Sequence, residues 1–342
     1  MNKISKYLKY RLRNLGLNRL FKTEYESSMI AYFDTSVSSL NIGDEIINIY
    51  GRKIVEDIFP NDQIFIANTH NGISGKIINI INICKYRLVC GTNLLDSNIS
   101  KRLGCWNITW LDIFRMKHII LLGVGWSEYS PRPNYLNKLF YKLLLSNKSV
   151  HSVRDEYTRN MLLSIGFDNV INTGCPTLWG ITEDICNQIP VQKSDCVIFT
   201  LTDYDKDVKA DQEIINILLR NYKRIYFWPQ GSGDLLYMES LMHENVKILA
   251  PRLSAYQNIL AKHDIDYVGT RLHAGIFAIR NLKRTIVISI DNRAKEISKS
   301  NNLTILERQN VKDELHQMIQ SEFKTNISID RKAIESWASQ FN

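Results

Sequence analysis

From residue 29 onward, apolar residues gather in short unbroken runs that alternate with longer amphipathic stretches. The runs lack the strict apolar–polar alternation of a half-exposed strand. They therefore predict strands of parallel sheets that are buried on both faces. The predicted strands cover residues 29–34, 62–68, 87–91, 117–126, 195–202, 224–230, 246–250, 266–270 and 285–290.

The amphipathic stretches predict helices that connect these strands. The clearest helices cover residues 41–59, 76–83 and 134–147, and residues 149–167 predict a strand end followed by a helix. The strands form two sets that divide near the polar segment 181–194, which favours an α/β protein with two Rossmann-like domains facing a cleft. The predicted domains cover residues 29–180 and 195–310, and the helices of 311–342 are expected to dock back on the first domain.

Residues 1–28 form a separate N-terminal segment. Residues 1–22 carry seven Lys or Arg and no acid, and Ile4, Leu8, Leu12 and Leu15 recur at helical spacing. Two interpretations stay open: a basic amphipathic helix that lies on an anionic membrane surface, or a solvated helix that packs on its own protein. The rest of the chain holds 36 basic against 35 acidic residues, so nucleic acid is not an expected partner.

Composition and cysteine spacing indicate a globular protein of a reducing compartment. Hydrophobic residues make up 44% of the chain, and no apolar run is long enough to span a membrane. The N-terminus lacks the apolar core of a secretory signal. The six cysteines are scattered without a Cys-x-x-Cys pair, so neither a disulfide framework nor a zinc site is expected.

Polar and glycine residues follow several predicted strands at the end where parallel α/β sheets bind ligands. Each position alone is ordinary turn chemistry, but together they predict a polar site for an anionic ligand. The positions are Gly43-Asp44, Gly123 with Gly125, Arg154, Pro229-Gln230-Gly231 with Asp234, and Arg271 with His273.

Several segments resemble the polysaccharide pyruvyl transferase family. They are "NIGDEII", "LLGVGW", "HSVRDEYTRNMLLSIGFDNVINTGCPTLWG", "PQGSGD", "GTRLHAGIFAI" and "IVISIDNRAKEI", spread from about residue 30 to 300. The resemblance implies a glycosyltransferase-B-like fold. It also implies transfer of pyruvate from phosphoenolpyruvate to sugar hydroxyls of a bacterial surface glycan, a capsule or exopolysaccharide, or its lipid-linked precursor, as a cyclic ketal.

Phosphoenolpyruvate carries a carboxylate and a phosphate, so its pocket needs guanidinium groups and backbone N–H groups. The expected donor-binding residues are Arg154, Arg271, Leu272, Gln230 and Asp234. Arg154 and Arg271 belong to different predicted domains, so the two arginines are expected to converge on the donor across the cleft.

Proton transfer to the donor's methylene carbon suits a histidine, whose pKa lies near neutrality. His273 follows Arg271 by two residues, and an extended backbone would point both side chains the same way. Asp44, expected on the opposite domain, is the candidate base for the acceptor hydroxyl. The alternative for Asp44 is an acid that stabilises a helix N-terminus.

Acceptor binding is assigned to loops 35–42, 69–75 and 92–115 of the first domain. Trp106, Trp110 and Trp126 are candidate sugar-stacking side chains, although tryptophan more often packs in a core.

Two other function classes stay open: a glycosyltransferase-B enzyme with a nucleotide-sugar donor, and a sugar-binding module without activity. The segment "DYDKD" (203–207) is similar to a metal motif but is interpreted as a solvated loop. No metal or cofactor is expected. The expected location is the cytoplasm, at the inner face of the cell membrane, with residues 1–22 as the peripheral membrane contact.

Overall fold

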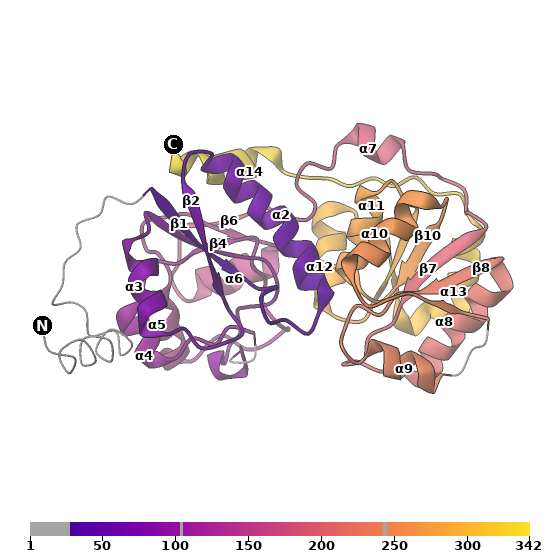
Figure 1. Ribbon diagram of the computed structural model, residues 1–342, viewed down its shortest axis with the longest axis horizontal. Helices are drawn as coiled ribbons and strands as arrows, with labels where there is room; N and C mark the ends of the chain where they lie inside the picture. Colours follow the sequence, from indigo (N-terminus) through magenta and orange to yellow (C-terminus); the bar gives the residue numbers. More distant parts are fainter. Residues whose placement is uncertain (1–27, 103–104, 242–244) are drawn as a thin grey trace, which may run out of the picture. The chain divides into compact units, whose positions relative to one another are not determined.

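The computed structural model describes residues 28–102, 105–241 and 245–342 (Figure 1). The chain divides into two compact units. Unit 1 comprises the chain up to Ser39, Asn48–Pro176 and Arg331–Asn342, and unit 2 comprises Leu40–Ile47 and Thr177–Asp330. The N-terminal segment, and with it the predicted basic helix, lies outside the described residues.

Unit 1 contains a parallel four-stranded sheet of order β2-β1-β3-β4 and a parallel pair β5-β6. Its strands are β1 (Met29–Asp34), β2 (Gln63–Asn68), β3 (Tyr86–Cys90), β4 (Ile120–Leu122), β5 (His151–Val153) and β6 (Val170–Asn172). Its helices are α2 (Ile42–Ile58), whose first residues belong to unit 2, α3 (Gly75–Ile83), α4 (Trp110–Arg115), α5 (Tyr135–Leu144), α6 (Glu156–Ser164) and α14 (Arg331–Ala338).

A buried histidine joins β4 to β5. The Leu121 N–H donates to Nδ1 of His151 over 3.2 Å, and Nε2 of the same ring lies 2.8 Å from the Ser146 carbonyl oxygen. Because Nδ1 accepts, the ring is neutral and donates through Nε2. Burial lowers the pKa of His151 to about 4. The side chain thus replaces part of the ladder between the two parallel sheets of unit 1.

The C-terminal helix α14 packs on unit 1, where Figure 1 draws it in yellow beside the indigo and magenta elements. The Trp337 indole N–H donates to the Val150 carbonyl over 2.9 Å, and Gln340 bonds both the N–H and the carbonyl of Val150. The preceding helix α13 (Val311–Gln320) belongs instead to unit 2 and packs on α8 (Val208–Asn221). The expectation that all of 311–342 docks on the first domain is therefore wrong for α13.

Unit 2 contains a parallel six-stranded sheet of order β12-β11-β10-β7-β8-β9. Counted from its first strand, this is the Rossmann order 3-2-1-4-5-6. The strands are β7 (Cys196–Thr200), β8 (Arg224–Phe227), β9 (Lys247–Ile248), β10 (Asp266–Gly269), β11 (Thr285–Ser289) and β12 (Ile305–Glu307). The remaining helices are α7 (Glu183–Asn187), α9 (Asp234–Ser240), α10 (Leu253–Lys262), α11 (Leu272–Arg280) and α12 (Asn292–Asn301).

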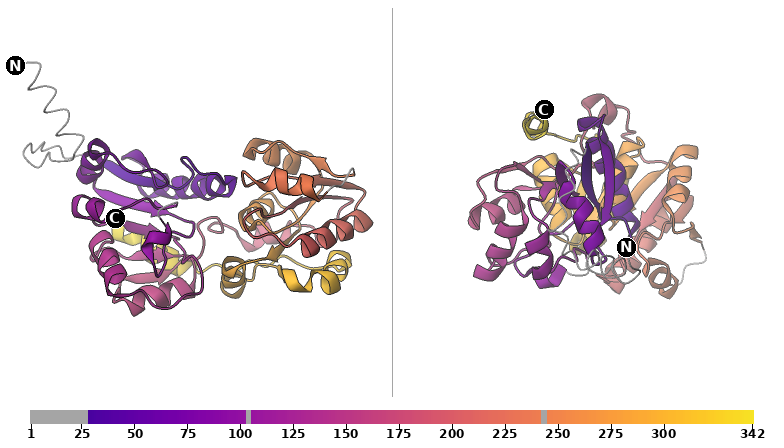
Figure 2. Two further views of the ribbon diagram at one scale, coloured as in Figure 1. Left: turned by 90° about the horizontal axis from the view of Figure 1, so that it is seen from below. Right: turned by 60° about the vertical axis from the view of Figure 1, so that its left-hand side comes forward.

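Helices cover both faces of this sheet (Figure 2). On one face, apolar residues of α8, α9 and α13 form a continuous core with Val197, Phe199 and Phe227 of the strands. On the other face, α11 approaches so closely that a Cβ at Gly275 would lie 2.6 Å from Val287. Burial on both faces explains why the strands are apolar without alternation.

The unit boundaries differ from the predicted ones at one important place. Residues 40–47 were assigned to the first domain, but they group with unit 2, because the chain before α2 pairs with the loop after β8. The predicted strand 117–126 shortens to β4, since Gly123 turns the chain with a φ of 60°. The short strands β6 and β12 were not predicted.

Within the described residues, the structure contains no helix both long enough and apolar enough to cross a bilayer.

The neutral form of His151 predicts a pH-dependent stability. An unfolded histidine titrates near pH 6.5, whereas the folded ring titrates at about 4. As the pH falls from 6.5 towards 4, the unfolded state therefore binds a proton that the folded state does not, and folding loses stability. This loss amounts to about 3 kcal/mol.

His151→Gln keeps an acceptor and a donor but cannot titrate, so its free energy of unfolding should fall less over this range than that of the wild type. Denaturant unfolding at pH 7, 5.5 and 4.5 measures the difference. The exposed His316→Gln is the matched control and should follow the wild-type curve. Parallel pH curves for all three proteins would contradict a buried neutral His151.

Candidate functional site

The carboxyl edge of the unit 2 sheet carries most of the predicted site residues. The strand order reverses between β7 and β10, so the loops after these two strands diverge there. The hydroxyl oxygens of Thr202 and Thr270, one from each loop, lie 2.7 Å apart. Ligands of open α/β sheets bind at this kind of switch point.

Arg271, directly after β10, is the centre of a buried polar cluster. Its Nε donates to Oδ2 of Asp234 over 3.0 Å, and its Nη2 contacts both Asp234 Oδ1 and, over 2.8 Å, Asp203 Oδ1. The two carboxylates therefore occupy the Nε–Nη2 edge of the guanidinium. Nη1 makes no hydrogen bond to any residue that the structure describes.

Asp234 begins α9 and holds the adjoining loops in place. Besides Arg271, its carboxylate accepts from the N–H groups of Asp203, Gln230 and Gly231 over 2.7–3.1 Å. Burial raises the pKa of the Asp203 carboxyl, but its interactions with Asp234 and with the charge of Arg271 outweigh this and set the pKa below its usual value. Asp203 therefore stays ionised beside Arg271.

A tyrosine and a second arginine extend the cluster. The ring of Tyr204, in the loop after β7, lies 5.0 Å from Cζ of Arg271, which follows β10, and 5.9 Å from Cζ of Arg293, which follows β11. Arg293 also contacts the Tyr204 hydroxyl, and its Nε donates to Asp291 Oδ2 over 2.8 Å. With two arginines and three aspartates, the cluster carries a formal charge of −1.

The loop before α2 is paired with the loop after β8. Asn41 forms an antiparallel bridge with Gly231, and the Ile42 N–H donates to the Gln230 carbonyl over 2.9 Å. Nε2 of Gln230 donates to Asn41 Oδ1 over 2.8 Å, while its Oε1 is buried and makes no hydrogen bond to the described residues. The "NIGDEII" and "PQGSGD" segments are thus hydrogen-bonded to each other, although they lie far apart in the sequence.

The catalytic candidates His273 and Asp44 and the donor-binding candidate Leu272 occupy helix starts. Arg271 is the N-cap of α11, and Leu272 and His273 are its first two residues, all buried. The expectation that the Arg271 and His273 side chains point the same way assumed an extended backbone. This assumption is wrong, because the backbone is helical from Leu272 onward. Asp44 is buried in the first turn of α2 and belongs to unit 2, not to the other domain as expected.

In unit 1, Arg154 follows β5 at the carboxyl edge. Its Nε donates to Asp155 Oδ2 over 3.2 Å, and its Nη1 donates to Asn93 Oδ1 over 2.9 Å. Its buried Nη2 lies 3.1 Å from Asp155 Oδ2 without hydrogen-bond geometry, so this donor remains unsatisfied among the described residues. The guanidinium packs over Gly125, where a Cβ would lie 2.3 Å from Cζ.

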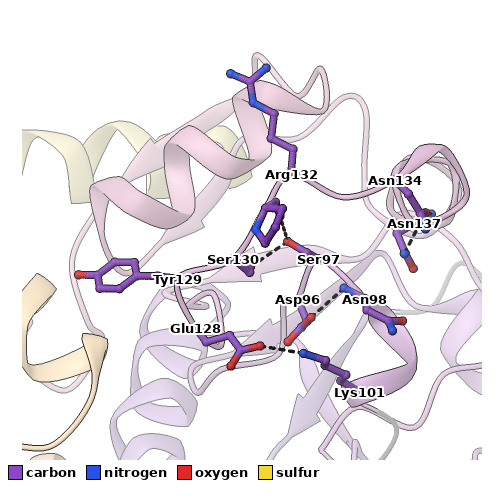
Figure 3. Close-up of a pocket in the computed structure, with 11 residues that line it drawn as sticks. Asp96, Ser97, Asn98, Lys101, Glu128, Tyr129, Ser130, Arg132, Asn134 and Asn137 are labelled. Atoms are coloured by element: carbon purple, nitrogen blue, oxygen red, sulfur yellow. Dashed lines mark hydrogen bonds and ion pairs between the residues drawn. The ribbon is translucent and has the colours of Figure 1, made fainter.

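A pocket of about 450 Å³ opens between the loops after β3 and β4 of unit 1 (Figure 3). Lys101 and Glu128 pair across it over 2.9 Å, and the Ser97 and Ser130 hydroxyls are bonded to each other. Two acidic side chains, Asp96 and Glu128, and two basic ones, Lys101 and Arg132, line the pocket, so its formal charge is zero. The lining residues are Asp96, Ser97, Asn98, Lys101, Glu128, Tyr129, Ser130, Pro131, Arg132, Asn134 and Asn137.

Trp106 and Trp126 do not line this pocket, and both rings are buried in the core of unit 1. The Trp126 indole N–H donates to Ser130 Oγ over 3.1 Å, and its ring packs near Tyr141. A buried ring offers no face to a sugar, so their assignment to acceptor stacking is wrong. Trp110 is partly exposed, on α4.

Sequence reasoning missed the residues that hold the arginines in place, namely Asp203, Tyr204, Asn41 and Asn93. The segment 203–207 is not a freely solvated loop. Asp203 pairs with Arg271, Asp205 pairs with Arg308, and Asp207 caps α8. The sequence held one signal for this pairing. The acidic segment 203–207 directly follows a buried strand, and Arg271 directly follows another strand of the same predicted domain.

No group of three or more histidine, cysteine, aspartate or glutamate side chains within the described residues is arranged to hold a metal ion.

Comparison with solved structures shows the fold. The UDP-GlcNAc 2-epimerase of Methanocaldococcus jannaschii is similar with a TM-score of 0.50 and 13% identity, over 91% of this chain and 98% of that one. MnaA of S. aureus, solved with UDP, has a TM-score of 0.48 and 15% identity, over 90% and 94%. The E. coli heptosyltransferase WaaC has a TM-score of 0.39 and 14% identity, over 85% and 98%.

At 13% identity, the similarity to the M. jannaschii epimerase shows only the fold, which consists of two Rossmann-like domains of the glycosyltransferase-B type. A search of curated protein sequences gives no significant match. The sequence profile of the family described as polysaccharide pyruvyl transferase, however, matches residues 41–292, which include the paired loops of unit 2, Arg154, Arg271 and His273. The protein therefore belongs to the polysaccharide pyruvyl transferase family.

Proposed function

We propose that the protein transfers pyruvate from phosphoenolpyruvate to two hydroxyls of a saccharide acceptor, a surface glycan or its lipid-linked precursor, and forms a cyclic ketal. Family membership over residues 41–292 is the observation that carries this proposal. The Rossmann order of unit 2 supports it, because the buried arginine cluster and the start of α11 lie at the switch point of the sheet.

The reaction needs one proton donor and one proton acceptor. The methylene carbon C3 of the donor takes a proton, and the first sugar hydroxyl adds to the resulting cationic C2. The phosphate then leaves with its bridging oxygen, and the second hydroxyl adds to C2 and closes the ketal. Of the two protons that the hydroxyls release, one balances the proton taken by C3 and one leaves with the phosphate.

In this proposal His273 delivers the proton to C3, and Asp44 receives a proton from an acceptor hydroxyl. Both residues belong to unit 2, each lies in the first turn of its helix, and both are buried, so water competes little with the reacting groups. The role assigned to Asp44 competes with its ordinary stabilisation of the α2 N-terminus.

In this proposal, the negative charge of phosphoenolpyruvate is met by N–H groups that make no hydrogen bond within the described protein. On unit 2, Nη1 of Arg271 makes no hydrogen bond to the described residues, and the first N–H groups of α11 point out of its N-terminus. On unit 1, taken by itself, Nη2 of Arg154 is likewise unused among the described residues. Asp234 fixes the orientation of Arg271, and Gln230 and Leu272 border it. Such held arginines bind an anion without first being ordered.

The neutral pocket of unit 1 is the proposed acceptor site. Its volume of about 450 Å³ suits one saccharide unit, and its lining includes hydroxyl, amide and carboxylate groups that bind sugar hydroxyls. The proposed place of action is the cytoplasmic face of the membrane, where residues 1–22 bring seven cations.

Donor identity can be tested by thermal unfolding. Because a ligand of the folded state raises the unfolding temperature, phosphoenolpyruvate should raise it, whereas UDP-sugars should not. Differential scanning fluorimetry with both ligands, and with inorganic phosphate as the charge control, checks this. A shift with UDP-sugars alone would replace the proposal with glycosyl transfer.

Proton transfer by His273 can be tested by substitution. His273→Gln removes the titrating imidazole but keeps an N–H group that can donate a hydrogen bond. Turnover should therefore fall by about 10²–10⁴, while the affinity for phosphoenolpyruvate changes little. Phosphate release measures turnover, and fluorimetric titration with phosphoenolpyruvate measures affinity. If a folded His273→Gln protein retained wild-type turnover, His273 would have no part in the proton transfer.

The packing of Arg271 against Gly231 can be tested with a matched pair of glycines. A Cβ at Gly231 would lie 2.2 Å from Arg271 Nη2, whereas a Cβ at Gly72 meets no atom within 4 Å. Gly231→Ala should therefore displace the guanidinium from Asp203, destabilise the fold by about 1–3 kcal/mol and weaken phosphoenolpyruvate binding. Gly72→Ala should change neither quantity, and equal behaviour of the two variants would refute the packing argument.

A further inference from the structure

An apolar surface on unit 1 has no role in the proposed chemistry. It consists of Trp110, Leu111 and Phe114 of α4 and Tyr135 and Leu136 of α5. Their exposed fractions are 38%, 74%, 57%, 76% and 61%, respectively. Single exposed apolar residues are common on protein surfaces. Five of them on two short helices that contact each other form a patch instead. We call this set the α4–α5 face.

The two helices present their exposed residues on one continuous surface. The Trp110 ring packs edge-on against the Phe140 ring, with centroids 5.3 Å apart. Phe140 lies one helical turn after Leu136, so the point of contact falls on the side of α5 that carries Leu136. Figure 1 shows α4 and α5 next to each other in unit 1. The apolar side of α5 thus continues into Trp110 and Phe114 of α4.

Lysines lie on or next to the two helices that carry this surface. Residues 110–118 and 135–144 contain three lysines, Lys117, Lys138 and Lys142, against the single acid Asp112, while Nε and Nη2 of Arg115 are buried and are not counted with the surface charges. Asp112 is engaged at the start of α4, where its carboxylate accepts from the Thr109 N–H over 2.9 Å. Lys117 and Lys142 are exposed.

From these observations we infer that the α4–α5 face docks on an anionic lipid bilayer. Apolar side chains flanked by lysine, with tryptophan and tyrosine among them, match the boundary between acyl chains and negatively charged headgroups. Residues 1–22 do not fit this face, because they carry seven cations and no acid and would meet like charge. A second copy of the chain would likewise oppose cation to cation.

Docking also defines how the acceptor arrives. Asn134 and Asn137, at the start of α5, line the polar pocket, and the exposed Leu136 lies between them in sequence. A bilayer on the α4–α5 face therefore holds the pocket at headgroup depth, where a lipid-linked saccharide presents its sugar. This consequence rests on the proposed function, whereas the docking itself does not depend on the transferase chemistry.

The test is co-sedimentation of the full-length protein with vesicles of equal parts phosphatidylglycerol and phosphatidylcholine, and with vesicles of phosphatidylcholine alone. The test variant is Leu111→Ser/Phe114→Ser, which removes apolar area without changing charge. The matched control is Leu236→Ser, because Leu236 on α9 of unit 2 is 72% exposed but lies outside the face. Circular dichroism and the unfolding temperature check that the variants fold.

We expect the wild type to bind the anionic vesicles, and the double variant to bind about tenfold or more weakly, since burial of two large apolar side chains is lost. Leu236→Ser should bind like the wild type. Lys138→Gln/Lys142→Gln, which leaves the apolar residues in place, should lose the preference for anionic over neutral vesicles. Phosphate release from phosphoenolpyruvate should be unchanged in all variants with a soluble acceptor, which separates failure of docking from failure of the proposed function.

Three results would overturn the inference. One is absence of wild-type binding to anionic vesicles. Another is equal binding by the double variant and the Leu236→Ser control. The third is a wild-type dimer in solution that the double variant converts to monomers, which would assign the face to a second copy of the chain.

Discussion

Parallel pairing of the strands within the sheets of each unit is the constraint on which the site depends. A parallel strand must return through a crossover, so each carboxyl end is followed by a loop and usually by a helix start. Loops, unpaired N–H groups and polar side chains therefore collect at one edge of each sheet. In unit 2 this edge unites residues that lie far apart in sequence, such as Asp203, Asp234 and Arg271.

A charge at this edge must be paired before it can serve a ligand, because an unpaired buried charge is costly. Arg271 satisfies this condition through Asp203 and Asp234, which fix its orientation and occupy one edge of its guanidinium. Arg154 is held by Asp155 and Asn93 in the same way, and its buried Nη2 makes no hydrogen bond to the described residues. Each arginine thus keeps one guanidinium nitrogen that can still bind an anion, Nη1 in Arg271 and Nη2 in Arg154.

Periodicity and turn chemistry predicted the α/β architecture, since buried parallel strands are uniformly apolar and their loops rich in glycine. They did not reveal that residues 40–47 group with unit 2, because the Asn41–Gly231 bridge joins positions separated by most of the chain. Trp106 and Trp126 show the same limit, since a tryptophan in a core and one on a sugar platform look alike in sequence. The family resemblance pointed to Arg271 and His273 as site residues, whereas the pairing of Arg271 depends on contacts that only the fold creates.

Helix α5 shows how a short element serves several purposes at once. Successive residues of a helix point about 100° apart, so its ten residues divide into distinct sides. Phe140, Tyr141 and Leu144 enter the core, Asn137 reaches the polar pocket, and Tyr135 and Leu136 remain exposed. The core side fixes the helix, and this fixes the exposed apolar residues relative to the pocket. Any surface that binds Tyr135 and Leu136 is consequently held at a set distance from the pocket lined by Asn134 and Asn137.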